Sequence, residues 1–168
     1  MEKNLYKEEQ RFSQWMSVVL FVVFGLPVMF LGNELALKIN TSEYLPLSIV
    51  LSFLLILWGS GVYFWGKMKL VVAIVENGIR LKYPPLLRKW KLIGKNEIER
   101  LVVRKYNPLM EYGGWGIKRN RQKRSYAYNV KGNVGLQLFL KNGKKILIGT
   151  QKKQAIEYAM KKLMEKGG

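Results

Sequence analysis

The residues of this sequence with the clearest capacity for chemistry form a short cationic run. The stretch at 117 to 125 holds five cations within seven positions: Lys118, Arg119, Arg121, Lys123 and Arg124. Side chains of one sign repel one another unless an anionic group lies near, and alone such a run is typical of an exposed, mobile loop. We take these five residues as candidate contacts to an anionic surface.

A glycine-rich motif, YGGWG, directly precedes the cationic run. It has neither the GxxxxGK[ST] spacing nor the following helix that a phosphate-binding loop needs. The pattern favours a backbone bend in which the glycines adopt positive φ and an aromatic neighbour packs on the domain. A ligand-binding loop is the alternative. The residues concerned are Tyr112, Gly113, Gly114, Trp115 and Gly116.

Composition narrows the chemistry further. The 168 residues include 29 Lys and Arg, 11 acidic residues that are all Glu, and no Cys, His or Asp. Catalytic nucleophile and base pairs usually need His, Cys or Asp, and zinc sites need His or Cys. Glu97 and Glu99 could imitate a carboxylate pair, but the neighbouring Arg100 favours a solvated strand end. We expect no catalytic, metal or cofactor-binding residues, with a Glu-dependent membrane enzyme as an alternative.

Two uncharged runs must position this chemistry. Residues 12 to 33 form a run of 22, and residues 44 to 66 form a run of 23. At about 1.5 Å per residue, each can cross a hydrocarbon core of roughly 30 Å as a helix. A cleaved signal peptide is the alternative for the first run, but its apolar core is too long and no cleavage motif follows. We predict a transmembrane hairpin with a short external loop at 34 to 43.

Lys and Arg are distributed unequally about these runs. Residues 1 to 11 contain 3, residues 34 to 43 contain 1, and residues 67 to 168 contain 25. The positive-inside rule then places both termini in the cytoplasm. We therefore expect a multi-pass cell-membrane protein with a cytoplasmic N-terminal tail at 1 to 11 and a cytoplasmic domain at 67 to 168.

The apolar pattern of this domain alternates as in β-strands. VVAIVENGIRLKY at 71 to 83 predicts a hairpin about Asn77 and Gly78, with Glu76 opposite Ile79. Further strands are predicted at 88 to 93, 98 to 106 and 125 to 130. One face of the first hairpin would gather Val72, Ile74, Ile79, Leu81 and Tyr83.

A second hairpin is predicted at 135 to 150, and its register is informative. A symmetric two-residue loop would oppose Leu138 to Leu147 and divide the apolar residues between both faces. A three-residue loop with a bulge at Gly143 instead gathers Leu136, Leu138, Leu140, Ile146 and Ile148. A C-terminal helix follows, with Thr150 as its expected N-cap and an apolar stripe of Ile156, Ala159, Met160, Leu163 and Met164.

About seven antiparallel strands followed by one helix is the element order of the pleckstrin-homology (PH) superfold, a curved sheet or barrel that the helix closes at one end. The sequence resembles a bacterial PH-like family whose domain often follows a two-helix membrane hairpin. Two stretches carry the resemblance, EYGGWGIKR at 111 to 119 and AYNVKGNVGLQLFLKNGKKILIGTQ at 127 to 151. It covers residues 67 to 166 and implies a PH-like fold, whereas the family implies no settled activity.

Charge and anchoring together suggest a function. Residues 67 to 168 carry 25 basic and 6 acidic side chains, a net charge of +19. Anionic lipid contributes about 1 kcal/mol for each Lys or Arg at the membrane surface. We expect a non-catalytic, membrane-tethered scaffold or interaction module that contacts anionic lipid headgroups, a protein partner or a second copy of the chain. A membrane-anchored nucleic-acid-binding domain is the alternative, and a high lysine content from an AT-rich genome would produce the same basic bias without any binding role.

Overall fold

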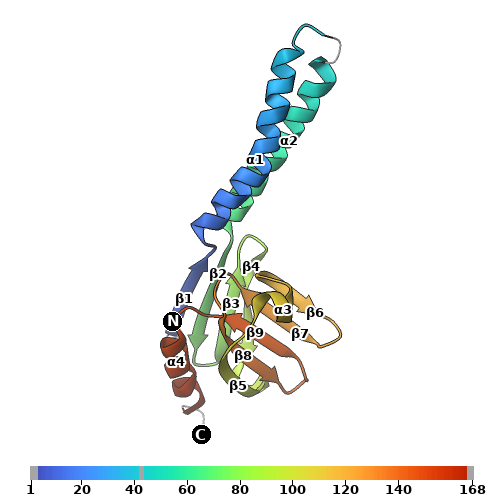
Figure 1. Ribbon diagram of the computed structural model, residues 1–168. Helices are drawn as coiled ribbons and strands as arrows, with labels where there is room; N and C mark the ends of the chain where they lie inside the picture. Colours follow the sequence, from blue (N-terminus) through green and yellow to red (C-terminus); the bar gives the residue numbers. More distant parts are fainter. Residues whose placement is uncertain (1–3, 42–43, 166–168) are drawn as a thin grey trace. The chain divides into compact units, whose positions relative to one another are not determined.

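The computed structural model describes residues 4 to 41 and 44 to 165, and the chain divides into two compact units (Figure 1). One unit is Ser13–Lys67, and the other combines Met1–Phe12 with Met68–Gly168. The first unit is therefore inserted into the sequence of the second. The free tail expected at residues 1 to 11 is wrong, because Asn4–Arg11 is a strand of the β domain.

The inserted unit consists of two helices, α1 (Gln14–Leu37) and α2 (Tyr44–Lys67), each of 24 residues. Within the described residues, α2 is long and apolar enough to cross a membrane, whereas the apolar stretch Phe21–Leu37 of α1 is shorter. The first predicted span, 12 to 33, is displaced, because α1 begins later and continues into the expected loop at 34 to 43. Pro27 lies within α1 without ending it.

The two helices pack on each other and leave their outer surfaces apolar. The rings of Phe21 and Trp58 lie 4.9 Å apart. No residue of α2 is buried, and Phe53 and Ile56 keep 65% and 72% of their surfaces exposed. Exposing an apolar surface along a whole helix is unfavourable in water, whereas contact with lipid acyl chains carries no such cost.

The described residues of the β domain form nine strands in two sheets. The first sheet has the order β1-β2-β3-β4 and the second has the order β5-β8-β9-β7-β6. The first comprises β1 (Asn4–Arg11), β2 (Lys69–Val75), β3 (Gly78–Tyr83) and β4 (Leu87–Gly94). The second comprises β5 (Ile98–Lys105), β6 (Gly116–Asn120), β7 (Ser125–Asn129), β8 (Val134–Leu140) and β9 (Lys145–Gly149). Three short or terminal helices complete the domain: η1 (Lys95–Glu97), α3 (Pro108–Tyr112) and α4 (Lys153–Glu165).

This arrangement corrects the expected fold of about seven antiparallel strands. The additional strands are β1 and β6, whose charged sequences NLYKEEQR and GIKRN were expected to be a tail and a loop. The described strands form two open sheets and no closed barrel. One pair, β7 with β9, is parallel, because the β6–β7 hairpin joins the edge of the β8–β9 hairpin. The mixture of one C-terminal helix with mainly β structure is confirmed.

The core lies between the two sheets and under α4. In the first hairpin Ile74 pairs with Ile79 and Val75 with Gly78, so the turn falls one residue earlier than expected. The expected face is nevertheless correct, because a register change of two residues keeps each side chain on its side of the sheet. Its five members are all buried: Val72, Ile74, Ile79, Leu81 and Tyr83.

The second hairpin has the bulged register. Leu138 pairs with Ile146, Leu136 pairs with Ile148, and the Leu140 amide donates to the Lys144 carbonyl at 2.9 Å. Gly143 has a φ of 76°, a left-handed conformation that non-glycine residues rarely adopt. The predicted bulge is therefore confirmed, together with the apolar face that it gathers.

Strand β1 is fastened to the start of α4 through a buried carboxylate. Glu8 is 4% exposed. It accepts hydrogen bonds from the Tyr6 hydroxyl at 2.6 Å, the Thr150 hydroxyl at 2.8 Å and the Gln151 amide at 2.9 Å. The Thr150 hydroxyl also accepts a hydrogen bond from the Lys152 amide at 3.1 Å. The prediction that Thr150 is the N-cap of α4 is wrong, because the helix begins only at Lys153. Burial, followed by the bond to Glu8, raises the pKa of Tyr6.

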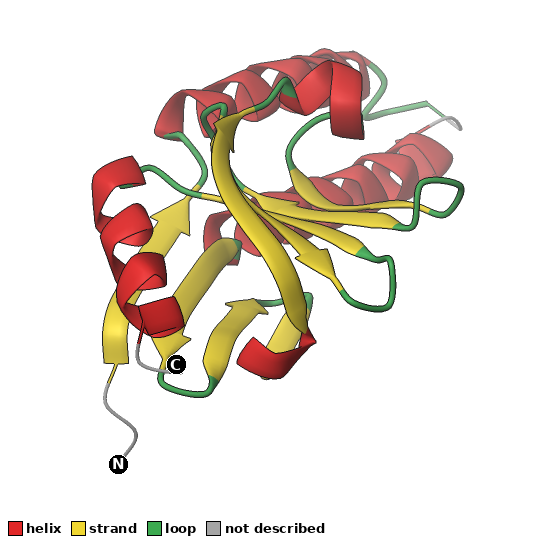
Figure 2. Ribbon diagram, turned by 90° about the horizontal axis from the view of Figure 1, so that it is seen from below, coloured by secondary structure: helices red, strands yellow, loops and turns green. Residues whose placement is uncertain are grey.

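The apolar stripe of α4 packs against β1, β2 and β8, and Figure 2 shows the helix beside β1. Four of the expected side chains are buried, namely Ile156, Ala159, Met160 and Leu163. The fifth, Met164, is 40% exposed, because the stripe ends before the last turn.

Replacing Glu8 with Ala should destabilise the domain. The change leaves the donors of Tyr6, Thr150 and Gln151 without their buried acceptor, which costs about 1 to 3 kcal/mol or more. Thermal melting of the full chain in detergent, followed by circular dichroism, measures the loss. Glu9→Ala is the control, because Glu9 forms exposed ion pairs with Arg11 and Lys69 that contribute about 0 to 1 kcal/mol. Equal effects of the two changes would contradict the buried role of Glu8.

Gly143→Val should lower the free energy of unfolding by about 1 kcal/mol or more, because a β-branched residue is strained at positive φ. Gly143→Asn should cost less, since Asn tolerates the left-handed region. The same melting experiment compares the two variants. If Val and Asn have equal effects, backbone strain at this turn is not what selects glycine.

Candidate functional site

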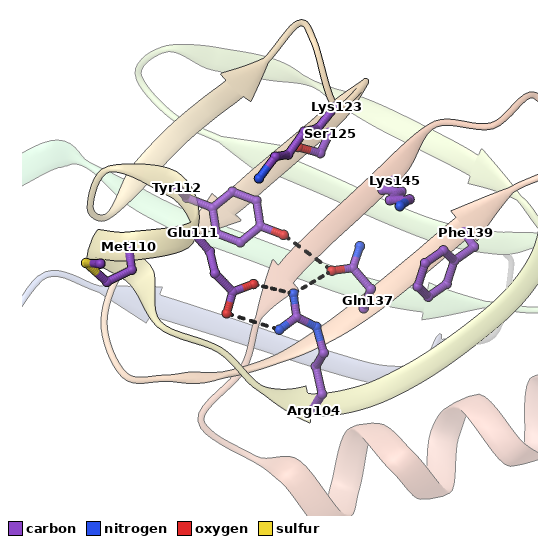
Figure 3. Close-up of a pocket in the computed structure, with 9 residues that line it drawn as sticks. All are labelled: Arg104, Met110, Glu111, Tyr112, Lys123, Ser125, Gln137, Phe139 and Lys145. Atoms are coloured by element: carbon purple, nitrogen blue, oxygen red, sulfur yellow. Dashed lines mark hydrogen bonds and ion pairs between the residues drawn. The ribbon is translucent and has the colours of Figure 1, made fainter.

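The second sheet has an outer face, turned away from the core, that carries most of its polar side chains. Cross-strand pairing places Arg104, Gln137 and Lys145 on this face, whereas Leu136 and Leu138 alternate onto the core side. A cavity of about 400 Å³ opens there (Figure 3). Its lining consists of Arg104, Met110, Glu111, Tyr112, Lys123, Ser125, Gln137, Phe139 and Lys145.

One wall of the cavity is α3, and local signals define both ends of this short helix. The Asn107 side chain accepts from the amides of Leu109 and Met110 at 3.1 Å each, and Pro108 occupies the first turn. The helix ends at Tyr112 and is capped by Gly113, which has a left-handed φ of 70° and whose amide donates to the Leu109 carbonyl. These signals hold Glu111 over the cavity.

An ion pair crosses the cavity from β5 to α3. The two terminal nitrogens of Arg104 donate to the two carboxylate oxygens of Glu111 at 2.7 Å and 3.2 Å (Figure 3). The Arg104 guanidinium, aided by the Asn107 amide, holds the pKa of Glu111 below its ordinary value. The same pair raises the pKa of Arg104. The charge of Arg104 is thus largely engaged within the protein.

Gln137 forms the polar floor beneath this pair. It is 3% exposed, and its side-chain oxygen accepts from Arg104 at 3.0 Å and from the Tyr112 hydroxyl at 3.3 Å. Burial raises the pKa of Tyr112, which keeps its hydroxyl a donor. Three elements, β5, α3 and β8, therefore meet at one amide oxygen.

The glycines of the YGGWG motif adopt positive φ and bend the backbone, as expected from the sequence. Gly113, Gly114 and Gly116 have φ values of 70°, 112° and 116°. The Gly116 amide donates to the buried side chain of Asn129 at 2.8 Å, and the Trp115 indole donates to the Gly132 carbonyl at 3.2 Å. The motif therefore ends α3, directs Tyr112 onto Gln137 and joins the loop to β7.

The five candidate cations of 118 to 124 do not act as one group. Lys118 pairs across the sheet with Ala127 and Arg119 pairs with Tyr126, so the two side chains lie on opposite faces. The Arg119 guanidinium lies 5.4 Å from the centroid of the Tyr126 ring. Only Arg121, Lys123 and Arg124 lie in the turn that joins β6 to β7.

A second turn brings further cations beside this one. Because β7 and β9 are parallel, the turns that precede them lie at the same end of the sheet. The Lys145 amide donates to the Arg124 carbonyl at 3.1 Å across the two turns. The exposed cations of the two turns, together with Lys145 at the start of β9, are here named the double-turn cluster: Arg121, Lys123, Arg124, Lys141, Lys144 and Lys145.

The double-turn cluster has little charge compensation, and of its cations Lys123 is attracted to a nearby carboxylate, that of Glu111. In the part of the chain that the structure describes, none of its six side chains forms an ion pair. Lys123 and Lys145 also line the cavity, where Arg104 adds a third cation and Glu111 is the one acidic side chain. The cavity and the cluster thus form one continuous basic site with room for a carboxylate or phosphate group.

The cluster lies at the same end of the β domain as the tip of the β2–β3 hairpin. The Lys141 amide donates to the Glu97 carbonyl in η1, and the Lys95 amide donates to Asn77 at the tip of the β2–β3 hairpin. Strand β2 runs from that tip to Lys69, two residues after α2. Its seven residues cover about 20 Å.

Sequence reasoning identified half of the double-turn cluster and none of the ion-pair system. Lys141, Lys144 and Lys145 flank a hairpin turn, but their proximity to Arg124 depends on the parallel pairing. The sequence did contain one signal for a polar site on this sheet. Gln137 is the one amide side chain in the segment LQLFL, and strand alternation places it on the face opposite to that of Leu136 and Leu138.

Glu111→Gln should make the domain slightly less stable at neutral pH and remove part of its pH dependence. Because the folded-state pKa of Glu111 is lowered, its contribution is complete above the unfolded pKa of about 4.3 and is lost as the pH falls through the folded value. For this half-exposed pair the loss should be under about 1 kcal/mol. Melting temperatures of wild type and variant should converge as the pH falls below the lowered folded-state pKa of Glu111. The exposed Glu99→Gln is the control, and a constant difference at all pH values would contradict the assignment.

Comparison with known proteins adds no relative. No family model, no curated protein and no solved structure matches this chain. The likeness to the PH-like family therefore stays a prediction that rests on the two quoted stretches. What the site can do must be argued from its own geometry.

Proposed function

We propose that this chain is a non-catalytic, membrane-anchored interaction module with a PH-like domain, whose basic site binds an acidic segment of a partner protein. On this proposal α1 and α2 both cross the cell membrane and both termini are cytoplasmic. The observation that carries the proposal is the double-turn cluster, six exposed cations that form no ion pair among the described residues.

Strand pairing supports a double crossing. Strand β1 precedes α1 and β2 follows α2, yet Arg11 pairs with Lys69 in one sheet. Both residues must then lie on the same side of any membrane, so the chain between them crosses an even number of times. If α2 crosses, α1 must cross as well. The excess of Lys and Arg on that side makes it the cytoplasmic side under the positive-inside rule.

The form of the site favours a flexible protein partner over a lipid surface. Lys123 and Lys145 line the cavity of about 400 Å³, and the other cations of the cluster are exposed beside it. A flexible acidic segment can place one carboxylate in the cavity and others along the cluster. Each carboxylate must come close to its cation, because screening limits electrostatic attraction to about 8 Å at physiological salt.

Nucleic acid is the weaker fit because the nearby rings are already covered. The Phe139 ring has Arg100 at 4.3 Å and Lys145 at 5.8 Å from its centroid. Tyr126 has Lys91 and Arg119 at 5.4 Å each. Single-stranded nucleic acid needs free aromatic faces for base stacking.

Replacing five cluster cations with Gln should weaken binding of a Glu-rich peptide to the full chain in nanodiscs of neutral lipid. The five are Arg121, Lys123, Arg124, Lys141 and Lys144. Each exposed ion pair contributes roughly 0.2 to 1 kcal/mol, so the Kd should rise about tenfold or more at about 0.15 M salt. Fluorescence anisotropy of the labelled peptide measures the change.

A matched control removes the same charge elsewhere. Lys131, Lys152, Lys153, Lys161 and Lys162 are exposed outside the site, and their change to Gln should alter the Kd far less. An equal loss of peptide affinity in both variants would mean that binding depends on net charge and not on the double-turn cluster. If the wild type binds anionic vesicles, or single-stranded or duplex DNA of equal charge, more tightly than the Glu-rich peptide, the partner is lipid or nucleic acid and not an acidic protein segment.

A further inference from the structure

The turn between β3 and β4 lies at the end of the domain where the helices join. The Lys69 amide donates to the Pro84 carbonyl at 3.1 Å. Lys69 follows the last residue of α2, Lys67, by only two positions. Two residues of extended chain span about 7 Å at most. Whatever the angle between the two units, the turn of Pro84, Pro85 and Leu86 is held near the end of α2.

This turn carries an apolar tip among cations. Leu86 is 54% exposed at the tip, and Trp90, four residues later on β4, is 44% exposed. Arg88 and Lys89 lie between them and are exposed. The Lys82 ammonium lies 4.7 Å from the centroid of the Trp90 ring. Aromatic and aliphatic side chains mixed with Lys and Arg are typical of the lipid–water interface.

We propose that the β3–β4 turn, through Leu86 and Trp90, rests in the headgroup region of the same membrane that α2 crosses. This inference depends on the membrane anchoring proposed above, but not on the double-turn cluster. Anchoring by α2 removes most of the entropic cost of association, because the turn is already at the surface. Arg88 and Lys89 add electrostatic attraction to anionic lipid. The apolar side chain of Leu86 is favoured beside the acyl chains, because its burial there removes apolar surface from water.

Edge pairing is the competing use of this surface. Strand β4 is the last strand of its sheet, and an exposed edge can pair with a second copy of the chain. Such pairing would cover residues along the whole strand, including Leu92, which is 45% exposed. Lipid contact should instead affect Leu86 and spare Leu92, which lies toward the far end of β4.

The absence of cysteine from the sequence permits a direct test with single labels. Leu86→Cys, Leu92→Cys and Leu55→Cys, each in the full chain, carry an environment-sensitive fluorophore in proteoliposomes that contain anionic lipid. Leu55 lies at the middle of α2 and reports anchoring. We expect the label at 86 to be blue-shifted and several-fold more quenched by shallow nitroxide lipids than by aqueous iodide, with the reverse ratio at 92. In the Leu86→Cys background, Arg88→Glu with Lys89→Glu should reduce nitroxide quenching.

The outcomes separate this inference from the proposed anchoring. Deep nitroxide quenching at 55 together with iodide quenching at 86 would overturn the turn's contact with lipid and leave the anchor standing. Iodide quenching at 55 would overturn both. Protection of 86 and 92 alike, dependent on protein density in the vesicles, would assign the edge to a second copy instead.

Discussion

The pairing of β1 with β2 is the constraint on which the rest of this structure depends. The chain leaves the first sheet at Arg11 and re-enters it at Lys69, and these two residues face each other across the strands. The helices between them, α1 and α2, form an antiparallel pair that returns the chain to the sheet (Figure 1). A loop of this length costs little more entropy to close than a shorter one, because the cost rises only logarithmically. Insertion of a helical hairpin into a sheet is thus compatible with a stable domain.

The same constraint makes the N-terminal strand part of the core rather than an accessory. Glu8 joins it to Thr150 and Gln151, and the Gln10 amide donates to the Gly149 carbonyl at 2.7 Å. Residues separated by most of the sequence are therefore adjacent at the start of α4. A domain cut at residue 67 would expose the edge of β2 and the buried donors that Glu8 satisfies. Binding experiments on this protein need the full chain for that reason.

Local pattern predicted the parts of the fold that local physics decides. The bulge at Gly143 followed from counting apolar residues on each face, because a slip of one residue would turn all of them outward. Positive φ in the glycine motif followed from the absence of a Cβ. Strand β1 was missed because NLYKEEQR is half charged, and what makes it a strand is the edge of β2, sixty residues away along the chain. Arg104, Glu111 and Gln137 were missed for a related reason, since each comes from a different element and no local spacing connects them.

Parallel pairing of β7 with β9 has a chemical consequence that an all-antiparallel sheet would not have. In an antiparallel arrangement the turns before β7 and β9 would lie at opposite ends of the sheet, and their cations would be separated by the strand length. The parallel pair brings the backbones of the two turns within hydrogen-bonding distance, as the bond from the Lys145 amide to the Arg124 carbonyl demonstrates. Concentrating like charges is unfavourable for folding, so the arrangement costs stability unless an anion is bound. The parallel pairing thus explains why six cations from two separate segments of the sequence form one basic surface.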